Sequence, residues 1–145
     1  MGDTVITSSG YGYGTHRIQI SRTDEGFEAK GLWFSKKLKA KFADMVVSGD
    51  YLYGLNDGRM VCLDLEGGDL KWRGSNFGHG QLLGVGEHMI VQGEQGEISI
   101  LEMSPEGEEV VLEFEALEHR TWNHPVLAGR ILLVRNDREA VAFQY

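Results

Sequence analysis

Cysteine and proline are scarce in this sequence. Its 145 residues include one cysteine, Cys62, and two prolines. A single thiol excludes an internal disulfide and any metal site built from several thiolates of one chain. Because Cys62 lies within an apolar run, we expect it to be a small buried residue.

Long apolar runs and a surplus of positive charge are also missing. No stretch approaches the ~20 apolar residues that cross a bilayer, so we expect no membrane span. The first ten residues, MGDTVITSSG, lack the basic and apolar regions of a signal peptide, and we expect none in this chain. The net charge is −8, and the basic residues are scattered apart from those at 36, 37, 39 and 41. Nucleic acid is therefore not an expected partner.

Glycine, by contrast, is abundant. The chain has 20 glycines, and 41% of its residues are hydrophobic. Many glycines among evenly spread aromatic and β-branched residues favour short strands joined by tight turns over long helices. The length suits one globular core. We therefore predict an all-β fold with a single domain over residues 1–145.

A repeat of about 40 residues runs along the chain. Three stretches share the order apolar strand, Gly-x turn, second strand, polar turn and third strand: VSGDYLYGLNDGRMVCLD (47–64), GVGEHMIVQGEQGEISILE (84–102) and LAGRILLVRNDREAVAFQ (127–144). Asp57-Gly58 is a strong hairpin signal, because both turn positions favour positive φ. The segments GDLKWR (68–73) and GEEVVLEFEA (107–116) supply fourth strands.

Four strands in each repeat predict the blades of a β-propeller. Each blade would be a four-stranded antiparallel meander. The expected blade units cover residues 3–35 (partial), 42–73, 80–115 and 124–145 (partial), which together make an open half-propeller.

One blade carries a more specific motif. In CLDLEGGDLKW (62–72), Cys62, Asp64, Gly67, Gly68 and Trp72 stand at the defined positions of the pattern A-x-D-x-x-T-G-x-x-x-W, with three identities. The segment resembles the tryptophan-docking repeat of the quinoprotein (PQQ-type) β-propellers. In that family the tryptophan wedges between blades.

The resemblance assigns structural roles to four residues. A tryptophan on an outer strand buries a large surface, glycine permits the preceding turn, and aspartate accepts hydrogen bonds from turn amides. We expect these docking roles for Asp64, Gly68 and Trp72, and for Trp33, which stands in the corresponding outer strand AKGLWFSK.

The same resemblance offers an enzymatic alternative, a fragment of a PQQ-dependent dehydrogenase. Such enzymes hold the quinone and Ca²⁺ in the central channel, with a catalytic Asp, Glu and Asn metal ligands and an adjacent cysteine pair. This chain has no Cys-Cys sequence and about half the blades. We expect no cofactor and no enzymatic activity, and favour a scaffold or protein-interaction module, as in the propellers of outer-membrane assembly lipoproteins.

A possible binding site lies at one mouth of the expected channel. Aligning the repeats places Phe42, His79 and Trp122 at one position, just before the innermost strands. The candidate binding residues are Asp44, His79, Gln81, Trp122, Asn123 and His124. The alternative is that His79, Asn123 and His124 satisfy backbone groups at strand starts. We expect no metal there, because no third ligand is convincingly placed. The Gly- and Tyr-rich hairpin SGYGYGTH (9–16) fits a flexible hairpin or a recognition loop.

An open half-propeller leaves two lateral faces bare, so we predict self-association. Two chains would close about eight blades around a two-fold axis, with residues 3–8 and 27–34 of one chain against 124–145 of the other. Trp33, Phe143 and Tyr145 are expected in that junction. A separate protein partner is possible, and a segment cut from a longer propeller would show the same features. The family is often periplasmic or secreted, but the sequence assigns no compartment.

Overall fold

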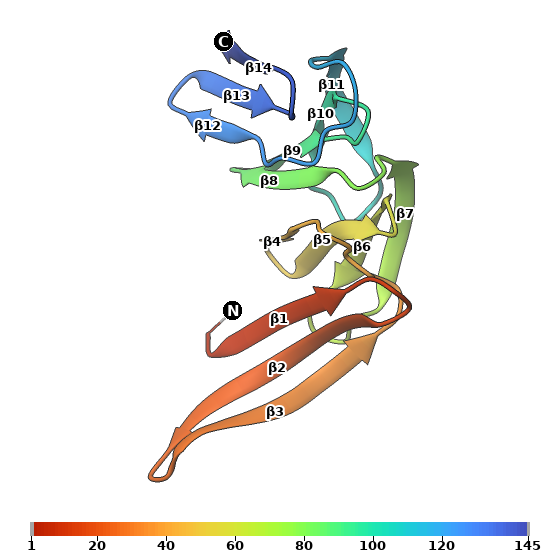
Figure 1. Ribbon diagram of the computed structural model, residues 1–145. Helices are drawn as coiled ribbons and strands as arrows, with labels where there is room; N and C mark the ends of the chain where they lie inside the picture. The colour runs from red at the N-terminus through yellow and green to blue at the C-terminus, as the bar shows by residue number, and fades with distance from the viewer. Residues whose placement is uncertain (1, 145) are drawn as a thin grey trace.

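The computed structural model describes residues 2–144, which form fourteen β-strands and no helix. The strands make four antiparallel sheets of three, four, four and three strands. These sheets follow one another in chain order and fan out from the N-terminal end to the C-terminal end (Figure 1). The predicted all-β fold of meander blades is confirmed. No helix in this part of the chain is long and apolar enough to cross a membrane.

Each sheet is a simple up-and-down meander, with sequential strands as neighbours. The first sheet contains β1 (Thr4–Ser9), β2 (Gly14–Thr23) and β3 (Gly26–Ser35). The second contains β4 (Met45–Ser48), β5 (Tyr51–Asn56), β6 (Arg59–Asp64) and β7 (Leu70–Asn76). The third contains β8 (Gln81–Val85), β9 (His88–Gln92), β10 (Glu97–Glu102) and β11 (Glu109–Glu115). The fourth contains β12 (Val126–Ala128), β13 (Ile131–Arg135) and β14 (Ala140–Gln144).

The turns explain why the repeat folds the same way each time. The turn after the first strand carries a glycine with φ of 54°, 60° and 61° at Gly49, Gly86 and Gly129. Between β5 and β6, Asp57 and Gly58 have φ of 48° and 97°, as the hairpin signal predicts. The register of β5 and β6 pairs Asn56 with Arg59, which leaves two residues in the loop.

The core lies between successive sheets. Leu52, Val61 and Leu63 of the second sheet face the first sheet, and Tyr53, Met60 and Cys62 belong to the cluster shared with the third. A third cluster joins residues of the third and fourth sheets: Ile90, Ile98, Leu132 and Val134. Each sheet-to-sheet contact therefore has its own apolar layer.

Middle and end sheets differ in how many faces they bury. In the second sheet, β5 and β6 each contain a run of four buried residues, because both faces are covered. In the fourth sheet, β13 alternates strictly between exposed and buried positions. Strict alternation means that only one face of this sheet is covered.

Candidate functional site

Two tryptophans of outer strands reach across to the next sheet. The indole Nε1 of Trp33 on β3 donates to the carbonyl of Leu65 at 3.0 Å, and Nε1 of Trp72 on β7 donates to the carbonyl of Ser104 at 2.9 Å. Each acceptor is 32 residues downstream, in the turn before the outer strand of the following sheet. Both indoles are partly buried. The two contacts repeat one geometry.

Gly68 receives the tryptophan of the preceding sheet. It has a φ of +74°, and a Cβ on Gly68 would lie 2.7 Å from Cε3 of Trp33. Asp64 closes the same turn, because its Oδ1 accepts from the Gly67 amide at 2.7 Å. The motif predicted that Trp72 wedges between blades, and its contact with Ser104 of the next sheet agrees. The structure shows that its turn also seats Trp33.

A different contact joins the third sheet to the fourth. Phe114 on β11 meets Phe143 on β14 edge to face, with ring centroids 5.1 Å apart. The prediction that Trp33 and Phe143 lie in a junction between two chains is therefore wrong, because both face the inside of their own chain. Tyr145, the third residue of that prediction, lies outside the described residues.

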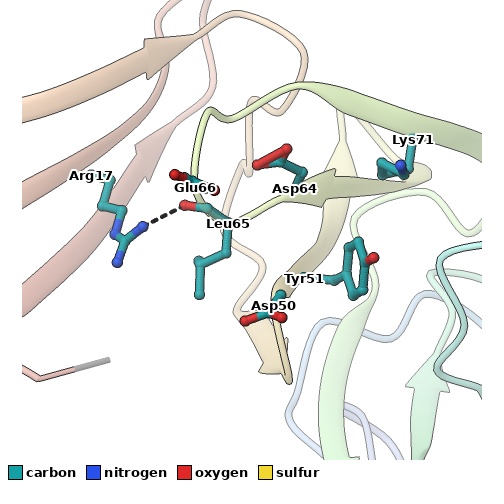
Figure 2. Close-up of a pocket in the computed structure, with 7 residues that line it drawn as sticks. All are labelled: Arg17, Asp50, Tyr51, Asp64, Leu65, Glu66 and Lys71. Atoms are coloured by element: carbon teal, nitrogen blue, oxygen red, sulfur yellow. Dashed lines mark hydrogen bonds between the residues drawn. The ribbon is translucent and has the colours of Figure 1, made fainter.

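A pocket of about 480 Å³ opens beside the contact between Trp33 and Leu65, which joins the first sheet to the second (Figure 2). Nη1 of Arg17 donates to the carbonyl of Leu65 at 2.6 Å, so this carbonyl accepts from both Arg17 and Trp33. The side chains around it are mostly charged: Asp50, Asp64, Glu66 and Lys71, with Tyr51. No three His, Cys, Asp or Glu side chains among residues 2–144 are grouped to hold a metal. Arg17 thus braces the joint at one wall of an open polar pocket.

Four aromatic rings form a continuous row across the inner ends of the sheets. Phe42, His79 and Trp122 precede β4, β8 and β12, and Tyr11 from the β1–β2 hairpin extends the line. Consecutive ring centroids are 6.3 Å (Tyr11 to Phe42), 6.3 Å (Phe42 to His79) and 6.5 Å (His79 to Trp122) apart. We call these four residues the aromatic row.

Glu94 ties the C-terminal half of the row together. It accepts hydrogen bonds from the backbone amide of His79 at 2.9 Å and from Nε1 of Trp122 at 3.0 Å, and its Oε2 lies 3.1 Å from Nδ1 of His79. Nε of Arg120 is 3.7 Å from its other oxygen. Burial alone would raise the pKa of Glu94, but these hydrogen bonds outweigh it and hold the pKa below its usual value. The carboxylate therefore stays charged and engaged.

Two buried glutamines anchor the backbone around the row. Nε2 of Gln81 donates to the carbonyls of Phe42 at 2.7 Å and of Trp122 at 3.3 Å, so one side chain links three sheets. Its neighbour across the strands, Gln92, donates to the carbonyl of Asn123 at 2.8 Å. Gln81 is 2% exposed, so its side chain holds the backbone of the row in place and is not itself accessible to a ligand.

The other predicted mouth residues lie nearby. Oδ2 of Asp44 is 3.6 Å from Nδ1 of His124, which links the second sheet to the fourth. Trp122 and Asn123 line one pocket, whereas His124 lines another beside the fourth sheet. The structure thus brings the six predicted residues into one region, and their role in binding stays a prediction.

Comparison with known proteins adds to this geometry. No protein-family model and no curated protein sequence matches the chain. Solved structures do match. BamB from Moraxella catarrhalis has a TM-score of 0.63 at 16% identity over 97% of this chain and 50% of that one. A europium-containing methanol dehydrogenase has a TM-score of 0.51 at 15% identity over 78% of this chain and 23% of that one. The computationally designed Ika8 protein has a TM-score of 0.56 at 10% identity, covering 100% of this chain and 56% of the other.

The chain has a β-propeller-type fold. At these identities the likeness concerns the fold alone. This chain spans about half the length of the BamB chain that it matches.

Sequence reasoning missed several residues that surround the aromatic row. Four such residues contact rings of the row: Tyr11, Lys41, Glu94 and Arg120. They were missed because the repeat alignment picks out only equivalent positions, those of Phe42, His79 and Trp122, and these four residues lie elsewhere in the repeat. Glu94 lies in the polar turn after β9, where its sequence neighbours give no sign of a partner at Trp122. The tyrosines of the 9–16 hairpin were the one available signal.

Proposed function

We propose that this chain is a non-enzymatic propeller scaffold that closes a ring by pairing with a second copy of itself. The observation that carries the proposal is an apolar face left uncovered on each end sheet. A monomeric protein rarely exposes a contiguous apolar sheet face, because such faces bury themselves against a partner. Two copies would bring eight sheets together.

The uncovered face of the fourth sheet carries exposed apolar side chains on all three strands, beside the polar Arg135 and Gln144 at its edges. Val126, Leu133 and Ala142 stand directly opposite one another across β12, β13 and β14. Val126 is 51% exposed and Leu133 is 44% exposed. Ile131 and Ala140 share this face by the alternation of exposed positions. We call these five residues the C-end face.

The uncovered face of the first sheet is apolar as well. Ile6 packs toward the second sheet, so its neighbour Val5 points the other way and is 49% exposed. Val5 pairs with Ile18 across β1 and β2, and Phe34 stacks on His16 on the same side. With Ile20, which lines a pocket beside Val5, these residues form the N-end face: Val5, Ile18, Ile20 and Phe34.

The two end faces differ, so their pairing is head to tail. The C-end face of one copy would pack on the N-end face of the other, and a second identical junction would close the ring about a two-fold axis. A single chain covers 50% of the BamB structure, in keeping with two chains supplying the length of one such propeller.

Charged substitutions on each face test this arrangement. Leu133→Lys and Val5→Lys should each spoil both junctions of the two-chain ring and so convert the dimer to monomers, as measured by sedimentation velocity. An equimolar mixture of the two variants should recover a dimer, because one junction between them keeps both wild-type faces. Val111→Lys, at a 54% exposed position on β11, is the matched control and should assemble as the parent does. Assembly unaffected by both end-face variants would contradict the proposal.

The enzymatic alternative has its own test. The fold similarity to the methanol dehydrogenase favours it, but such an enzyme needs carboxylate and amide oxygens grouped around a channel Ca²⁺. No cluster of three His, Cys, Asp or Glu donors exists within residues 2–144. An absorbance titration with PQQ and Ca²⁺ should show no stoichiometric uptake. Uptake at 1:1 with dye-linked alcohol oxidation would overturn the scaffold proposal.

A further inference from the structure

The aromatic row exposes large apolar surface at a place where nothing in the fold requires it. Tyr11 is 74% exposed, Phe42 is 68% exposed and Trp122 is 51% exposed. None of the three belongs to either end face, so ring closure does not account for them. Side chains of this kind dominate the energetics of protein interfaces.

The backbone holds two of these rings out at a cost. Phe42 has a φ of 64° and Tyr11 has a φ of 56°, in the left-handed region that bulky residues rarely occupy. Gln81 fixes the Phe42 carbonyl while also holding that of Trp122. Strained backbone that the surroundings hold in place is characteristic of functional surfaces.

The spacing of the rings matches an extended peptide. Consecutive centroids are 6.3, 6.3 and 6.5 Å apart. In a β-strand, every second side chain lies on the same face about 6.6 to 6.8 Å farther along. Each step between neighbouring rings is therefore close to the step between same-face side chains of an extended segment.

Each end of the row carries a cation. Nζ of Lys41 lies 4.8 Å from the Tyr11 ring centroid and 5.9 Å from that of Phe42, and the Arg120 guanidinium lies 5.1 Å from the Trp122 ring. Lys41 forms no ion pair within residues 2–144, and Glu94 is shared among His79, Trp122 and Arg120. These cations stand out on a chain whose net charge is −8.

We propose that the aromatic row binds a short extended peptide segment of a partner protein, with apolar side chains over the central rings and a carboxylate at each end. The carboxylates would pair with Lys41 and Arg120, and the apolar side chains would pack against Phe42 and His79. This inference deepens the proposed interaction role of the scaffold and rests on it.

The test uses a fluorescent peptide, Glu-Ser-Leu-Ser-Leu-Ser-Glu, titrated with the full chain and followed by fluorescence anisotropy. The peptide should bind, and a higher salt concentration should weaken the binding because salt screens the charge pairs. Phe42→Ala and Trp122→Ala should each weaken binding about tenfold, as should the charge reversals Lys41→Glu and Arg120→Glu. Phe42→Ala removes an exposed ring from a strained position and should remain folded.

Matched controls keep the result interpretable. Tyr13→Ala removes a 68% exposed ring from the same hairpin as Tyr11, and Lys30→Glu reverses an exposed charge on β3; both should bind like the parent. A peptide with lysine in place of glutamate should not bind.

Four results would overturn the inference. They are no binding at 1 mM peptide, equal binding of the lysine peptide, row variants that bind as the parent does, and row-dependent binding to phosphatidylglycerol vesicles without peptide binding. Light scattering on the parent chain separates this inference from ring closure. Absence of peptide binding to a parent chain that assembles counts against the row alone, whereas absence of assembly in a parent chain that binds the peptide counts only against self-association.

Discussion

At the scale of single residues, the tryptophan contacts are the clearest structural device of the chain. Trp72 packs against the cluster between the second and third sheets and also hydrogen-bonds to Ser104. Trp72→Ala should lower the free energy of unfolding by about 3 kcal/mol, because it leaves a void and an unpaired carbonyl. Chemical denaturation at fixed chain concentration measures the change. Trp122→Ala, at a half-exposed ring, is the control and should cost much less. Equal costs for the two variants would contradict a joint at Trp72.

Gly68 makes a prediction of the same kind. Its positive φ and its 2.7 Å approach to the Trp33 ring leave no room for a side chain. Gly68→Ala should therefore destabilise the chain by about 1 to 3 kcal/mol. Gly107 occupies the same position of the next repeat, but a Cβ there meets nothing within 4 Å. Gly107→Ala should leave the denaturation midpoint nearly unchanged, and a loss as large as that of Gly68→Ala would refute the steric argument.

Cys62 links burial to pH. It is fully buried, and burial raises the pKa of its thiol to about 11. In the unfolded chain the thiol has a pKa of about 8.5, so above that pH the unfolded chain loses a proton that the folded chain keeps. Stability should fall as pH rises from about 8.5 toward 11, and Tyr53, whose pKa burial also raises, adds to the loss. Cys62→Ala should flatten this decline in denaturation midpoints measured against pH. Parallel profiles for the two proteins would show that the thiol plays no part.

At the scale of elements, local patterns predicted the strands well and their cross-sheet partners poorly. The Asp57-Gly58 turn and the repeated glycines are predictable, because each residue determines the backbone conformation at its own position. The residue type alone therefore indicates the turn. The bond from Trp33 to the Leu65 carbonyl joins positions 32 residues apart in different sheets, and any carbonyl could serve as the acceptor. The same limit hid Glu94, whose partners His79 and Trp122 come from other segments.

The end sheets show how an element's surroundings change its pattern. A two-sided burial produces the continuous apolar run of β6, whereas β13 alternates because one face is open. An ordinary alternating strand would place polar residues on the open face, but here that face presents Ile131 and Leu133. This departure from the usual pattern is visible only after the sheet's orientation is known. The sequence therefore predicted the end segments 3–8, 27–34 and 124–145, but not which of their side chains face outward.

At the scale of the whole molecule, the account depends on what covers these two faces. The proposed head-to-tail closure would use both faces in each of two identical junctions, and it would leave the aromatic row exposed at the mouth of the ring. A closure angle that does not fit two copies would give larger rings or aggregates instead. The mass in solution therefore distinguishes a closed pair from other outcomes.

The most direct test is light scattering coupled to size exclusion at micromolar chain concentration. The account predicts a single species with twice the 16.2 kDa mass of the chain, unchanged on tenfold dilution. A stable, cooperatively folded monomer over the same concentrations would contradict ring closure by self-association.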